Sequence, residues 1–151
     1  MLNLTLLIKG LVGALLQVAF FGALLLIPAG TWQWTEANQF LYFYGLLTLI
    51  STVFLAIKAP RSLEARLEIP MSKSQPLSDR IATNFLLVFL IGWFVFIPVD
   101  VFHLKYFAPP QHIISILGGI LSLFGYGIML TALYQNEFAT TVVRDQSDRG
   151  H

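Results

Sequence analysis

Four long stretches of this chain carry no charged side chain, and they constrain its fold more than any other feature. A helix rises about 1.5 Å per residue, so about 20 apolar residues cross a hydrocarbon core about 30 Å thick. Each stretch is long enough for one such crossing. We therefore predict an all-α, polytopic membrane protein with short loops. The four transmembrane helices are expected at approximately residues 6–28, 38–57, 81–99 and 112–135.

The composition supports a membrane protein and excludes several kinds of site. Only 11% of the 151 residues are charged and 56% are hydrophobic, whereas about a quarter of a soluble domain is charged. So few charges cannot cover a surface that faces water. The chain contains no cysteine, which excludes disulfides, thiolate metal sites and cysteine nucleophiles. No basic block points to nucleic acid.

The first apolar stretch could be a cleaved signal peptide or a retained helix. Its apolar run is longer than the signal-peptide core of about 7 to 15 residues. Its end, LIPAGTW, lacks a small-x-small cleavage site, and Pro28 with Gly30 is expected to end the helix there. We expect the stretch to be retained.

The lysines and arginines predict the orientation. With four spans, both termini lie on the same side as the middle loop. That side would hold Lys9, Lys58, Arg61, Arg66, Lys73, Arg80, Arg144 and Arg149, and the other side only Lys105. Because cytoplasmic loops are rich in lysine and arginine, we expect both termini to be cytoplasmic.

The middle loop contains one segment with a helical pattern. In SLEARLE, Leu63 and Leu67 are spaced to lie on one face of a helix. The segment could be a short amphipathic helix along the cytoplasmic interface or a solvated loop. The sequence leaves both alternatives open.

The fourth predicted helix carries a stripe of small residues at steps of three and four. Its members are Ser115, Gly118, Gly119, Ser122 and Gly125. Small residues let helices approach closely in lipid. We therefore expect this face to pack against another helix, with a ligand channel as the alternative.

Three residues near the outer ends of the third and fourth helices could suggest a metal site. Asp100, His103 and His112 are of ligand type, but their spacing is short and irregular. Capping of helix ends explains them equally well, and we predict no metal site.

The last sixteen residues, NEFATTVVRDQSDRGH, are polar and form a tail after the bundle of residues 1–135. Composition alone would make them a solvated tail. Their order is distinctive: asparagine and phenylalanine at 136 and 138, a valine–arginine step at 143–144, and DRGH ending at His151. This order resembles the start of the catalytic segment of the isoprenylcysteine carboxyl methyltransferase family, including its bacterial relatives.

Weaker similarities extend over the rest of the chain in the same order. They are PAGTWQW after the first helix, AP with LEARL after the second, SDR before the third, and Asp100 after it. The resemblance implies an integral-membrane, S-adenosylmethionine-dependent methyltransferase that modifies a lipophilic acceptor at the cytoplasmic face. It also implies a bacterial inner membrane as the location.

The resemblance further implies that contacts with S-adenosylmethionine begin at Arg144 and His151. The Gly-Pro-Tyr turn and Arg-His-Pro motif that follow in the family do not occur in these 151 residues. We therefore expect this chain to be an N-terminal portion, truncated within the cofactor-binding segment 136–151 and inactive alone. No catalytic residue can be assigned. The alternative is a non-enzymatic accessory or structural membrane protein that packs through the fourth helix.

Overall fold

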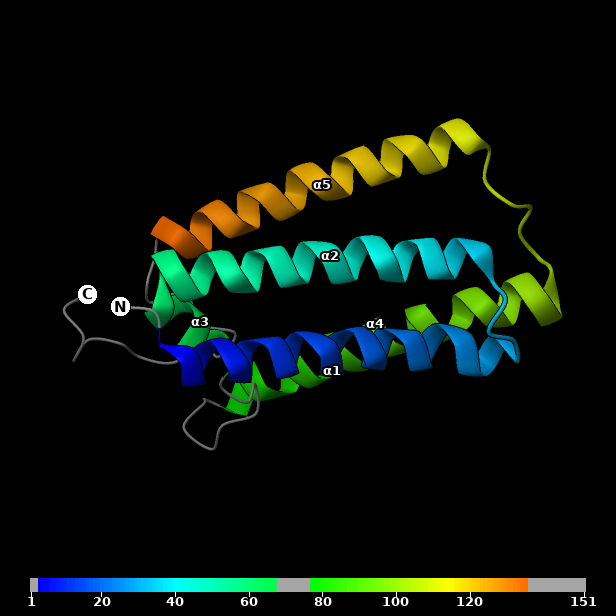
Figure 1. Cartoon of the computed structure of the whole chain (residues 1–151). Helices are drawn as coiled ribbons and strands as arrows, with labels where there is room; N and C mark the ends of the chain where they lie inside the picture. The colour runs from blue at the N-terminus through cyan, green and yellow to red at the C-terminus, as the bar shows by residue number, and fades with distance from the viewer. Residues whose placement is uncertain (1–2, 68–76, 136–151) are drawn as a thin grey trace.

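The structure is a computed structural model that describes residues 3–67 and 77–135. Every regular element in those ranges is helical (Figure 1). In chain order the elements are α1 (Leu4–Ala29), α2 (Thr35–Lys58), α3 (Pro60–Arg66), α4 (Leu77–Val99), the π-helical turn η1 (Asp100–Leu104) and α5 (His112–Gln135). The long helices run alternately up and down. We call the end that holds α3 the α3 end, and the end that holds Gly30 and Lys105 the opposite end.

Within residues 3–67 and 77–135, four helical segments are long and apolar enough to cross a membrane, as the sequence predicts. These segments are Leu4–Ala29, Thr35–Lys58, Arg80–Leu104 and His112–Gln135. The fourth coincides with its predicted bounds, and the first two are longer than predicted by a few residues at their ends. The third continues past Val99 because η1 extends it to Leu104.

The first helix ends through its capping residue. Pro28 lies within its last turn, and Gly30 adopts a left-handed conformation with φ of 69°. The Gly30 N–H donates to the Ile27 carbonyl, as in a glycine C-cap. A side chain is disfavoured at this φ, so glycine lets the chain turn directly into α2.

The core forms around the α1–α2 hairpin in two apolar clusters. At the α3 end the buried members are Leu6, Leu55, Ala56, Ala59 and Leu63. At the opposite end they are Leu25, Leu26 and Ala37. Each cluster joins α1 to α2, so the hairpin is fixed at both ends.

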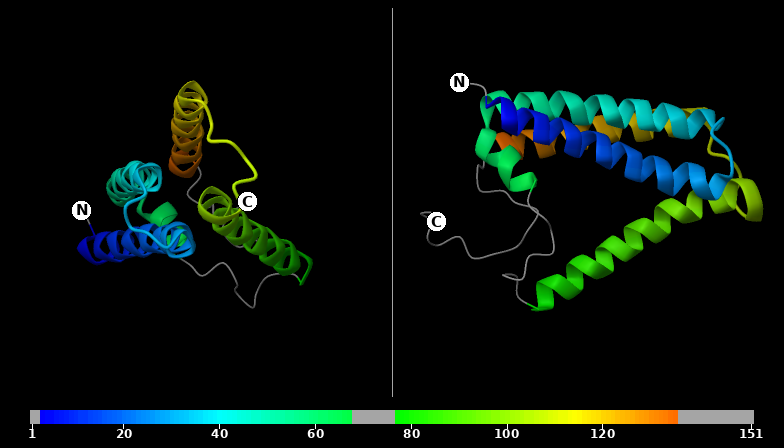
Figure 2. Two further views of the ribbon diagram at one scale, coloured as in Figure 1. Left: turned by 90° about the vertical axis from the view of Figure 1, so that its right-hand side faces the viewer. Right: turned by 60° about the horizontal axis from the view of Figure 1, so that its bottom comes forward.

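The other two long helices pack on this hairpin over only part of their length. Near the opposite end α4 reaches α1, where the Phe21 and Phe94 ring centroids are 4.7 Å apart. Toward its N-terminal end α4 leaves the hairpin (Figure 2). The last half of α5 approaches α2, and none of its residues is fully buried. The large apolar side chains along α4 and α5 therefore stay exposed, as side chains that face lipid would be.

The middle-loop segment that could be helix or solvated loop is helical. α3 buries Ser62, Leu63 and Ala65. A Cβ built on Gly10 would lie 3.3 Å from a Leu63 methyl, and one on Gly13 would lie 3.2 Å from a Leu67 methyl. Leu63 and Leu67 therefore both face α1, as their spacing predicts.

Candidate functional site

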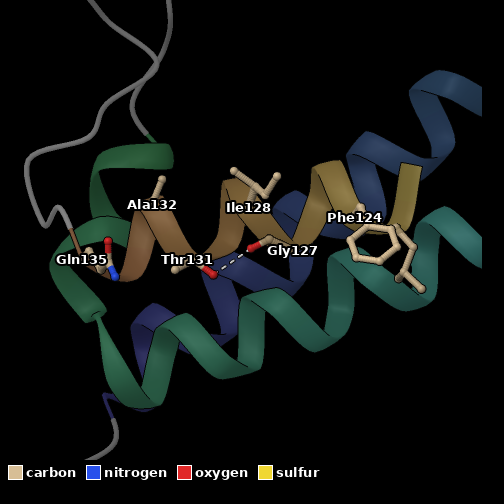
Figure 3. A pocket seen from close by; sticks show the side chains of 7 residues that line it. Phe124, Gly127, Ile128, Thr131, Ala132 and Gln135 are labelled. Carbon is tan, nitrogen blue, oxygen red and sulfur yellow. Dashed lines mark hydrogen bonds between the residues drawn. The ribbon is translucent and has the colours of Figure 1, made fainter. Parts of the chain in front are cut away.

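A shallow groove runs along the second half of α5. Its volume is about 550 Å³. The lining residues are Leu123, Phe124, Gly127, Ile128, Thr131, Ala132 and Gln135 (Figure 3). They all belong to one helix, so the groove is open along its length. It ends at Gln135, the residue before the tail 136–151.

The groove is apolar because of how its residues are spaced. Phe124, Ile128 and Gln135 recur at intervals of four and seven, which places them on one helix face. Gly127 has no side chain and leaves a depression on that face. The hydroxyl of Thr131 donates to the Gly127 carbonyl at 2.9 Å, so this polar group is satisfied within the helix. The groove therefore suits an apolar molecule better than a polar one.

One side-chain hydrogen bond fixes the middle of α5 to α2. The Ser51 and Tyr126 hydroxyl oxygens are 2.7 Å apart, and Ser51 is only 1% exposed. Ser51 also donates to the Thr48 carbonyl at 3.0 Å. Since a serine hydroxyl has one proton, Tyr126 is the donor to Ser51 while Ser51 binds Thr48. The hydroxyl proton of Tyr126 is therefore used in the hydrogen bond to Ser51.

A second contact fixes the end of α5. The Ser62 hydroxyl on α3 donates to the Leu133 carbonyl at 2.6 Å. Leu130 and Leu133 also pack against the apolar cluster at the α3 end. The Phe54 and Tyr134 rings meet nearby, with centroids 5.7 Å apart. The groove and the described end of α5 are therefore held against α2 and α3.

The two residues expected to begin the cofactor contacts, Arg144 and His151, lie outside the described residues, as does the whole segment 136–151. The described part of the chain ends at Gln135. It therefore places the apolar groove directly before this segment in the chain.

The small-residue stripe of α5 has no packing partner among the described helices. A Cβ added to Gly118, Gly119 or Gly125 would meet nothing within 4 Å. The Ser122 hydroxyl donates to the Gly118 carbonyl of its own helix at 2.8 Å. The expected close packing of this face is therefore absent from residues 3–67 and 77–135, and the prediction of a helix partner remains a prediction.

Asp100 and His103 both bind backbone groups at the opposite end. Buried Asp100 accepts from Tyr106 N–H at 2.8 Å and from Phe107 N–H at 3.3 Å. His103 Nε2 lies 3.0 Å from the carbonyl oxygen of Pro28, which makes Nε2 the protonated nitrogen. No group of three or more histidine and carboxylate side chains in the described ranges could hold a metal. These two residues stabilise the junction of α4, η1 and α1.

The groove and the two contacts that hold α5 were not predicted from the sequence. Ser51 is a polar residue within an apolar span, which is a signal for an interhelical bond in lipid. That signal identifies no partner. No protein-family model matches this chain, and neither a curated protein nor a solved structure matches it.

Proposed function

We propose that this chain forms the membrane-embedded part of an S-adenosylmethionine-dependent methyltransferase similar to isoprenylcysteine carboxyl methyltransferases. Its product would be a methylated lipophilic acceptor. The observation that carries the proposal is the position of the apolar groove on α5. It ends at Gln135, where the segment that resembles the family's catalytic segment begins.

The groove suits the lipophilic part of an acceptor. Its lining runs from Leu123 to Gln135, about 18 Å along a helix that rises about 1.5 Å per residue. The groove is open along its side, so a hydrophobic chain could enter from lipid without crossing water. Gln135 supplies a polar side chain at one end, close to where a polar reacting group would leave the hydrocarbon.

The groove does not suit the methyl donor. S-adenosylmethionine is polar and charged, whereas the hydroxyl of Thr131 is already bound to Gly127. A polar donor left without partners in an apolar groove would lose its hydration without replacement. We therefore assign the donor site to the segment after Gln135, where the resemblance implies that Arg144 and His151 contact the donor.

The proposed chemistry requires few ionisable groups. S-adenosylmethionine would supply an electrophilic methyl group on a sulfonium. With a carboxylate acceptor, an oxygen–carbon bond forms as the carbon–sulfur bond breaks, and the sulfur keeps the electron pair. A carboxyl group has a reference pKa of about 4, so it is already ionised at neutral pH and needs no general base. With an amine acceptor, a proton would have to leave first.

The protein must therefore position the two reactants and exclude water from the site where they meet. Aligning two reactants can account for much of a rate enhancement, and desolvation strengthens the electrostatic interactions in the site. In this proposal α5 orients the acceptor through the groove. The contacts of Ser51 and Ser62 keep α5 in place.

The proposed orientation places the α3 end in the cytoplasm of a bacterial inner membrane. Lys9 and Lys58 lie at that end of α1 and α2, and Arg61 and Arg66 lie on α3. Lys105 lies at the opposite end. This asymmetry follows the rule that cytoplasmic ends are rich in basic residues, and it puts the groove's Gln135 end on the side where S-adenosylmethionine is made.

Donor binding tests the proposal. The protein expressed from its complete native gene is dialysed against radiolabelled S-adenosylmethionine. We expect saturable binding that weakens about tenfold or more in Arg144→Ala and His151→Ala, as expected for a lost charge-assisted contact. Lys105→Ala, at the opposite end, is the matched control and should bind like the unmodified protein. Absence of saturable binding to the unmodified protein would refute the proposal.

A second candidate function is a non-enzymatic accessory protein that packs through α5. It is favoured by the open face at Gly118, Gly119 and Gly125. Single cysteines placed on this face can be crosslinked in native membranes. Capture of one defined protein through this face, together with no donor binding, would favour this second function over methyl transfer.

A further inference from the structure

The carbonyl of Leu133 belongs to the last turn of α5 that the structure describes. Ser62 donates its hydroxyl to this carbonyl at 2.6 Å. The Ser62 side chain is completely buried, at 0% exposure. A side chain from a different helix therefore binds the last described turn of α5.

Ser62 is itself held firmly, because α3 continues directly from α2. Ala59 joins the two helices, and its N–H donates to the Leu55 carbonyl at 2.9 Å. Leu63, the next residue after Ser62, packs in the apolar cluster with Leu6 and Leu55. The hydroxyl thus projects from an element that both α1 and α2 support.

The first half of α5 lacks comparable support. At Gly118 and Gly119 an added Cβ would meet no atom within 4 Å. The contacts of α5 with the rest of the bundle gather at Tyr126, Leu130 and the last turn. The position of the described end of α5 therefore depends on a small number of contacts, which include the Ser62 bond to Leu133 and the ring contact of Tyr134 with Phe54.

We infer that Ser62 is a positioning residue: its bond to the Leu133 carbonyl fixes the end of α5, and with it the point where residues 136–151 begin. The role of that segment in methyl transfer rests on the proposed function. Ser62 touches neither reactant in this proposal. It sets where the donor segment starts relative to the acceptor groove.

Distance measurements between spin labels test the inference directly. Because the chain has no cysteine, pairs of introduced cysteines label only the chosen sites. The pair Ile57→Cys and Gln135→Cys, both exposed, reports the α3 end. The pair Tyr42→Cys and Ile113→Cys, 79% and 57% exposed, reports the opposite half of α2 and α5.

We expect Ser62→Ala to broaden the distance distribution of the first pair and leave the second pair unchanged. Ser122→Ala is the matched control, because it removes a serine-to-carbonyl bond of the same kind within α5. The control should change neither distribution. If Ser62→Ala leaves the first distribution unchanged, or broadens both equally as a general loss of structure would, the inference is wrong.

Donor affinity separates this inference from the proposed function. In the protein from its complete gene, Ser62→Ala should raise the Kd for S-adenosylmethionine several-fold, and Ser122→Ala should not. If the unmodified protein binds no donor, the proposed function fails, but the distance measurements still decide whether Ser62 positions the end of α5. If the donor binds and its Kd is the same in Ser62→Ala, the positioning role in donor binding is refuted.

Discussion

The hydroxyl oxygens of Ser51 and Tyr126 lie 2.7 Å apart and join the middle of α2 to α5. Both residues lie within helices that are apolar enough to cross a membrane. Hydrocarbon offers no water as a replacement partner, so a polar pair in lipid is most stable when its members bind each other. This bond therefore sets the position of α5 beside α2 and, with it, the position of the groove.

Tyr126→Phe removes the hydroxyl and keeps the ring. Interhelical hydrogen bonds in membranes contribute about 0.6 kcal/mol on average and up to about 1.7 kcal/mol. We expect a destabilisation of about 1 kcal/mol, measured by unfolding with a denaturing detergent in mixed micelles. Tyr42→Phe is the control, since Tyr42 is 79% exposed. Equal stability of the two variants would contradict the structural role of the bond.

Gly10→Ala tests how closely α1 approaches α2 and α3. A Cβ at this position would lie 2.7 Å from a Thr52 methyl and 3.3 Å from Leu63. Overpacking of this kind typically costs about 1–3 kcal/mol. Gly92→Ala is the control, because a Cβ there meets nothing within 4 Å and should stabilise the helix by up to about 1 kcal/mol. We expect the unfolding midpoint to fall in Gly10→Ala and to rise in Gly92→Ala. A Gly10→Ala protein that is more stable than the unmodified protein would contradict the close packing of α1 at Gly10.

Asp100→Ala should destabilise the junction between η1 and the loop that follows. The buried carboxylate accepts from the N–H groups of Tyr106 and Phe107. Leaving such donors unpaired costs about 1–3 kcal/mol. Asp100→Asn keeps one carbonyl oxygen as an acceptor, so its loss should be smaller. Thermal unfolding of the two variants checks this order, and an Asp100→Asn protein as unstable as Asp100→Ala would argue against it.

Gly127→Leu should fill the groove on α5. If the groove holds the acceptor, the variant should raise the acceptor KM about tenfold or more, as expected for loss of a buried apolar contact. The Kd for S-adenosylmethionine should not change. Gly125→Leu is the control, because Gly125 does not line the groove and an added Cβ there meets no atom. Equal acceptor KM values in both variants would place the acceptor elsewhere.

Much of the fold follows from local hydropathy. A continuous apolar stretch determines a span without reference to its neighbours, so each of the four predicted spans corresponds to a long apolar helix in the structure. The third span was predicted to end at Val99 because a charged residue follows. The helix continues through Asp100 since its carboxylate binds the backbone of Tyr106 and Phe107. Hydropathy does not contain this information.

The contacts that hold the candidate site in place were less predictable, because they join residues from different helices. The sequence marks Ser51 as unusual within an apolar span, but the partner Tyr126 is 75 positions away. The bond from Ser62 to Leu133 likewise requires that α3 pack against α1 near Gly10. None of these relationships has a local sequence pattern.

The most direct test of the central claim is methyl transfer in oriented membrane vesicles. Charged S-adenosylmethionine does not cross hydrocarbon readily, so it reaches only the outward-facing side of each vesicle. With protein from the complete native gene, the account predicts labelled methyl groups in the lipid-soluble fraction of inverted vesicles. Right-side-out vesicles should show no such label. Label no higher than in vesicles without the protein, in both orientations, would contradict the account.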